Sequence, residues 1–92
     1  MSELNEDPAS RAGRYIASLT AELEKTSTIQ EGTVVNRSNI DRVTDAIRRY
    51  LQDARHYLDQ GRATTSLASV VYAEGLLDAL TFLELAQPRI KQ

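Results

Sequence analysis

The chain has 92 residues, of which 41% are hydrophobic and 26% are charged, and this composition suits one folded domain with a modest core. The formal charge of −2 gives no general attraction for nucleic acid or for an anionic membrane, so neither is an expected partner. Cysteine is absent and histidine occurs once, which excludes disulfides, thiolate zinc sites, cysteine nucleophiles and a His-rich metal site within one chain.

The N-terminal residues 1–6 are polar and acidic, and they predict a frayed tail. They lack the basic and apolar regions of a signal peptide. No apolar run approaches the roughly 20 residues that a membrane-spanning helix needs. We therefore expect a cytoplasmic protein that forms a single helical domain over residues 1–92 and uses no metal and no cofactor.

The first predicted helix covers residues 8–25. Asp7 is a suitable N-cap, and Pro8 suits the first helical position. Apolar residues then recur at helical spacing along one side of the helix: Ala12, Tyr15, Ile16, Leu19 and Leu23.

Residues 26–37 are predicted to form a loop, because β-branched residues and Gly32 interrupt the helical pattern. A two-stranded element in this segment is an open alternative, although it would not be stable alone. We expect Ile29, Val34 and Val35 to pack against the helices.

The second predicted helix covers residues 38–60. Ser38 and Asp41 have the spacing of a capping box, with Ser38 as N-cap. Apolar residues follow one face of the helix, and Gly61 suits the left-handed position just after its end.

The third predicted helix covers residues 63–86, with Pro88 marking its end. The connection around Gly61 is short, so the second and third helices are expected to be antiparallel neighbours. The third helix is apolar on almost every side, as in a helix that is central to its fold or covered by another subunit. We therefore expect a homo-oligomer or a protein partner that binds through helix 63–86.

The stretch "YAEGLLDAL" at residues 72–80 combines two packing features. Gly75 belongs to a strip of small residues that also contains Ala68, Ala79 and Ala86, and such a strip allows close approach of another helix. Glu74 and Asp78 occupy a separate sector, one helical turn apart. They either reach an exposed strip or meet arginines such as Arg14 or Arg62, or they bind a cation or a basic partner. A di-metal carboxylate site is strongly disfavoured, since it needs four helices and Glu-x-x-His pairs, which this chain lacks.

Arg49 and His56 are separated by six residues on the second helix. This spacing overlaps the pattern of HEPN-type ribonucleases, which are also helical. A solvated helix face is the competing explanation, because acidic residues interleave with these basic ones. No phosphate-binding loop, nucleophile elbow or catalytic triad can be assembled, so we predict no catalytic residue outside this alternative.

Residues 50–85 resemble the archaeal family called domain of unknown function 357. The signature is matched at residues 72–79, "YAEGLLDA", whereas Arg62 and Leu80 depart from the family pattern. The resemblance implies an archaeal protein with a three-helix, up-and-down bundle and supplies no catalytic residues. It also implies that Tyr72, Gly75 and Asp78 belong to the element that defines the family.

These observations predict an all-α fold with two long antiparallel helices and a shorter N-terminal helix. The function that we expect is a non-enzymatic interaction or self-association module, with Tyr72, Glu74, Gly75 and Asp78 as candidate interaction or ligand residues. The alternative is a HEPN-like ribonuclease or nucleotide-processing module that uses Arg49 and His56. A small-ligand or cation site at Glu74 and Asp78 is a third hypothesis.

Overall fold

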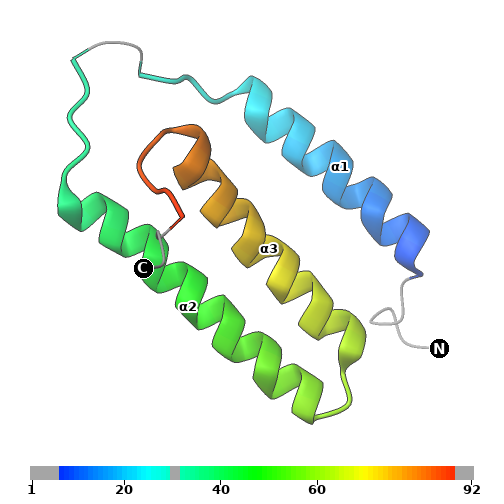
Figure 1. Ribbon diagram of the computed structural model, residues 1–92. Coiled ribbons are helices and arrows are strands. Elements are labelled where there is room, and N and C mark those ends of the chain that lie inside the picture. The colour runs from blue at the N-terminus through cyan, green and yellow to red at the C-terminus, as the bar shows by residue number, and fades with distance from the viewer. Residues whose placement is uncertain (1–6, 30–31, 89–92) are drawn as a thin grey trace. The chain divides into compact units, whose positions relative to one another are not determined.

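Figure 1 shows the computed structural model, which describes residues 7–29 and 32–88. Within these residues the chain forms three α-helices and no strand: α1 (Pro8–Glu24), α2 (Arg37–Asp59) and α3 (Ala63–Phe82). The chain divides into two compact units, Met1–Thr33 with α1 and Val34–Gln92 with α2 and α3. The predicted all-α class is confirmed. A single domain over residues 1–92 stays a prediction, and the predicted tail at 1–6 lies outside the described residues.

Helix α1 begins as its sequence predicts. Asp7 is the N-cap, and its Oδ1 accepts a hydrogen bond from the backbone N–H of Ser10 at 2.7 Å, while Pro8 occupies the first helical position. The helix ends at Glu24, one residue before the predicted end. No residue of α1 is buried, and the side chains of its apolar stripe are exposed.

Helix α2 begins one residue earlier than predicted, and the predicted cap is wrong. Asn36, not Ser38, is the N-cap. Its side-chain oxygen accepts from the Asn39 N–H at 3.1 Å, and the Asn39 side-chain oxygen accepts from the Asn36 N–H at 3.1 Å. Asparagine at both positions thus completes a reciprocal capping box. The Ser38 hydroxyl instead donates to the Asn36 oxygen at 2.6 Å and so supports the cap.

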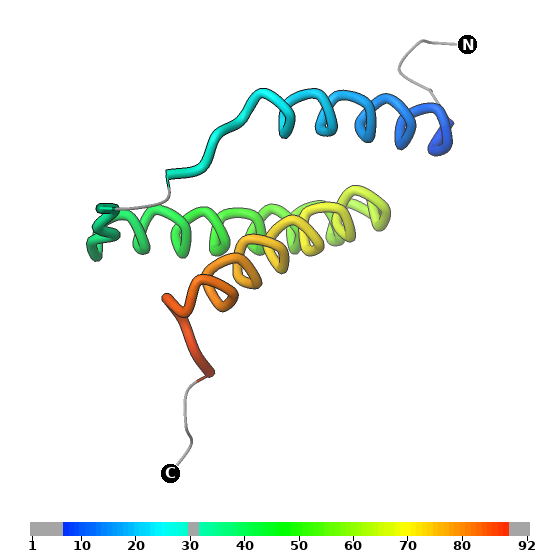
Figure 2. The backbone as a smooth tube through the Cα atoms, turned by 90° about the horizontal axis from the view of Figure 1, so that it is seen from above, coloured from blue at the N-terminus to red at the C-terminus, as the bar shows by residue number. Residues whose placement is uncertain are grey.

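The turn between α2 and α3 follows the prediction for Gly61. This glycine has a φ of 77°, which only glycine adopts without strain. The Gly61 N–H donates to the Leu58 carbonyl at 3.0 Å, and the Arg62 N–H donates to the Tyr57 carbonyl at 2.9 Å. These two bonds form a Schellman motif, and α3 then runs back along α2 as an antiparallel neighbour (Figures 1 and 2).

Helix α3 ends at Phe82, so the predicted end at residue 86 is wrong. Glu84 has a φ of 61°, and this left-handed residue turns the chain out of the helix. The Glu84 N–H donates to the Thr81 carbonyl at 2.9 Å, and the Leu85 N–H donates to the Leu80 carbonyl at 2.8 Å. The same Schellman motif therefore closes α3 without a glycine.

The core of the α2–α3 hairpin is built mainly from small side chains. Ala54, Ala73 and Leu80 are its buried apolar residues, and Ser66 is buried with them. Small residues allow the two helix backbones to approach closely. Val34 and Val35 precede α2 in the same unit and are exposed, so they contribute little to this core. The expectation that Val34 and Val35 pack against these helices is therefore wrong, and the same expectation for Ile29, which belongs to the other unit, stays a prediction.

No helix within the described residues combines the length and the hydrophobicity that a membrane crossing requires.

Candidate functional site

Helix α3 packs on α2 through one strip of its surface, which we call the first seam. The seam follows the alternating three- and four-residue spacing of helix-packing positions: Ser66, Ser69, Ala73, Leu76 and Leu80. Three of these residues are buried and two are half-buried. Helix α2 therefore covers one side of α3 only.

Most large apolar side chains of α3 lie away from the first seam. They are between 39% and 81% exposed, and we call them the outer surface of α3: Leu67, Val70, Val71, Tyr72, Leu77, Phe82 and the C-cap Leu83. Apolar side chains exposed in this number along one helix are typical of interaction sites.

Glu74 and Asp78 lie between residues of this outer surface around the helix, and both are exposed. Arg62, one of the cations predicted to meet them, instead stands over the ring of Tyr57 at 4.9 Å. Arg14 stands over the ring of Tyr15 at 5.1 Å. Among the described residues no group of three or more His, Cys, Asp and Glu side chains could hold a metal ion. Both carboxylates are exposed, and an arginine partner, a cation or a ligand there stays a prediction.

Gly75 is exposed, and a Cβ built on it would meet no atom within 4 Å. Contacts within the described chain therefore do not require glycine at this position. Ala68 and Ala79 of the predicted strip are exposed as well, on the same side of α3. Ala86 is not part of the strip, because it lies beyond the end of the helix.

Tyr72 connects the outer surface of α3 to α2. Its ring lies against the ring of Tyr50, with centroids 4.4 Å apart and planes inclined by 58°. Tyr72 is still 52% exposed, so the contact holds the ring in place and leaves half of it accessible. Tyr50 was not among the predicted site residues. Its position on the apolar face of α2 was the sequence feature that could have indicated a contact with α3.

Arg49 and His56 lie two turns apart on α2, about 10.5 Å along the helix axis. Both side chains are exposed. The His56 ring lies 6.1 Å from the Tyr57 ring, and no contact between Arg49 and His56 occurs among the described interactions. The residues share a helix face, and a joint site stays a prediction.

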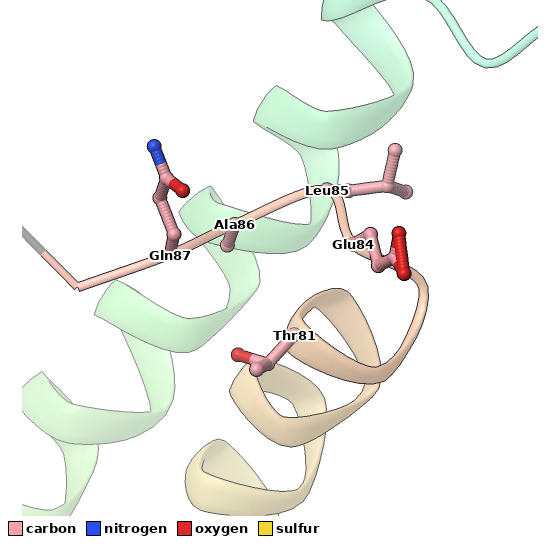
Figure 3. Close-up of a pocket in the computed structure, with 5 residues that line it drawn as sticks. All are labelled: Thr81, Glu84, Leu85, Ala86 and Gln87. Atoms are coloured by element: carbon pink, nitrogen blue, oxygen red, sulfur yellow. The ribbon is translucent and has the colours of Figure 1, made fainter.

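Two open grooves lie near the end of α3. One, of about 550 Å³, follows the turn after the helix and is lined by Thr81, Glu84, Leu85, Ala86 and Gln87 (Figure 3). The Thr81 hydroxyl donates back to the Leu77 carbonyl at 3.1 Å, so it is not directed at a ligand. The other, of about 480 Å³, has Arg37 and Arg48 at its rim. Both arginines already pair with carboxylates of α2, at 3.1 and 3.0 Å. Neither Arg49 nor His56 lines these grooves.

The fold and the surface together define a class of protein, namely a small all-α chain built on an antiparallel hairpin with an apolar second helix. Residues 14–86 match the family described as Protein of unknown function (DUF357). The match covers more than half of the chain, so the chain belongs to this family, as the residues of "YAEGLLDAL" predicted. No curated protein and no solved structure matches the chain significantly.

Proposed function

We propose that this chain is a non-enzymatic interaction module that associates with a second copy of itself through the outer surface of α3. The observation that carries the proposal is the exposure of seven large apolar side chains on a helix that α2 covers on one side only. Removing such surface from water is favourable by about 25 cal/mol per Å² of apolar area.

The outer surface is also broad. At about 100° per residue, and measured through the side that α2 does not cover, Tyr72 and Leu77 point about 220° apart around α3. Val71 and Phe82 lie between them. A partner that covers this range of directions must contact α3 on more than one side. Such a wide contact suits a subunit interface better than a small-molecule pocket.

The ribonuclease alternative gains no support from geometry. Arg49 and His56 are exposed, and neither lines the grooves near the end of α3. It stays a prediction that an RNA-cleavage assay can test.

The mass in solution, measured by light scattering over a dilution series, tests the proposal. We expect wild type to have at least twice the chain mass at high concentration and to dissociate on dilution. A double variant, Val71→Gln with Phe82→Gln, should be monomeric with an unchanged helical circular-dichroism spectrum. Val34→Gln is the matched control, because Val34 is equally apolar and 84% exposed but lies outside the helices. A wild type that is monomeric at every concentration would refute the proposal.

A further inference from the structure

We infer that residues 83–87 form a conformational switch, which we call the switch segment. In the state that the structure shows, the turned state, Glu84 has a φ of 61° and the chain turns back after α3 (Figures 1 and 3). In a second state, the extended state, the same residues continue α3 as far as Ala86. The inference concerns the α2–α3 hairpin alone and does not depend on the proposed self-association.

The sequence of the switch segment favours the extended state. Residues 83–86 are Leu-Glu-Leu-Ala, which are all among the residues with the highest helix propensity. The first residue that opposes a helix is Pro88, which also disfavours a helical backbone at Gln87. The turned state instead holds Glu84 in the left-handed region, which is strained for a residue with a side chain. Such strain persists only where the surrounding structure compensates for it, and it is concentrated in segments that switch.

Leu85 is the side chain that compensates for the strain in the turned state. It is half-buried, whereas Phe82 and Leu83 just before it are 81% and 67% exposed. Leu85 and the half-buried Ala86 line the groove of about 480 Å³, which Ile40 of α2 also lines. Withdrawing the leucine from water in this groove stabilises the turned state through the hydrophobic effect.

Extension of α3 would move Leu85 away from this groove. At about 100° per residue, position 85 of a continuous helix lies about 140° around the axis from Leu80, which is buried in the first seam. Position 85 then follows Phe82 by one turn, on the outer surface of α3. The turned state therefore covers the groove with Leu85, and the extended state opens the groove and adds an apolar residue to the outer surface.

Replacing Leu85 by alanine tests the inference, because alanine removes the apolar side chain and is a strong helix former. Backbone NMR chemical shifts of the isotope-labelled full chain report the helical state of each residue. In wild type we expect helical shifts to end at Phe82. In Leu85→Ala they should continue to Ala86, with a negative φ at Glu84. Leu83→Ala is the matched control, since it removes an exposed leucine two residues earlier and should keep the wild-type helix end.

Two further variants make the test decisive. Leu85→Gln should extend the helix as Leu85→Ala does, and it replaces that variant if Leu85→Ala fails to fold. Adding Glu84→Gly to Leu85→Ala should restore the turn, because glycine adopts the left-handed conformation without strain and disfavours a helix. A helix end that stays at residue 82 in both Leu85 variants would overturn the inference, as would a wild-type helix that already reaches residue 86. A wild type that is monomeric in light scattering would refute the proposed function only.

Discussion

The hydroxyl of Ser66 donates a hydrogen bond to the backbone carbonyl of Ala54 at 2.7 Å, and this bond joins α3 to α2 inside the hairpin core. Both residues are buried, Ala54 at 4% and Ser66 at 7% exposure. The Ala54 carbonyl is an α2 backbone group, so the serine adds a directional contact to a core that is otherwise small and apolar. The bond favours one register of α3 against α2.

Replacing Ser66 by alanine should therefore lower the stability of the hairpin. The loss should be about 0.5–1.5 kcal/mol, the net value of one intramolecular hydrogen bond. Urea unfolding followed by circular dichroism measures it. Ser69→Ala is the control, since Ser69 lies on the same seam and its hydroxyl makes no side-chain hydrogen bond among the described residues. Equal stability of Ser66→Ala and Ser69→Ala would show that the bond contributes nothing.

The N-cap of α2 provides a second prediction. Asn36→Ala removes the capping-box bond that its side chain accepts from the Asn39 N–H and the bond that it accepts from the Ser38 hydroxyl, and it should cost about 0.5–2 kcal/mol. Ser38→Ala removes only the hydroxyl that donates to Asn36, so it should cost clearly less. Thermal unfolding of the two variants compares these costs. A larger loss for Ser38→Ala would contradict the observed cap.

The two helix starts show where sequence reasoning is reliable and where it is not. Asp7 followed by Pro8 was the single start predicted for α1, and the structure confirms Asp7 as the N-cap. Before α2, however, Asn36 and Ser38 are both good caps, and a single helix can use only one. The reciprocal bond from Asn39 decides between them, and three-dimensional geometry rather than residue type reveals it.

In the candidate site, too, some features could be predicted from the sequence and others could not. Helical periodicity was sufficient to separate Gly75 from the carboxylates Glu74 and Asp78. Periodicity could not predict which side α2 covers, because α3 is apolar on several sides. The end of α3 was also missed, since the usual glycine signal is absent and Glu84 takes the left-handed conformation instead.

Glu84 gives a third prediction. A non-glycine residue in the left-handed region is strained by roughly 1–2 kcal/mol. Glu84→Gly should relieve part of this strain and raise the stability of the hairpin. Gly61→Ala should do the opposite, because Gly61 has a φ of 77° at the equivalent position after α2. Urea unfolding should thus show changes of opposite sign, and changes of the same sign would contradict the assigned turns.

The ribonuclease hypothesis is tested by incubating the purified chain with labelled single-stranded RNA. If Arg49 and His56 act together, His56→Ala should abolish cleavage, and Arg49→Gln should reduce it strongly. Arg55→Gln is the control for the loss of one positive charge on an exposed neighbouring residue of α2. Intact RNA with wild type would end the hypothesis.

The N-cap of α1 makes a prediction about pH. The hydrogen bond from the Ser10 backbone N–H lowers the pKa of Asp7 below its ordinary value of 3.8. A carboxylate whose pKa is lower in the folded state stabilises that state above the ordinary value. Its contribution is lost as the pH falls through the lower, folded pKa. Helix content measured by circular dichroism between pH 5 and pH 2 should therefore decrease more steeply in wild type than in Asp7→Asn, which keeps a capping oxygen but cannot titrate. Identical profiles for the two proteins would show that the charge of Asp7 does not contribute to the stability of α1.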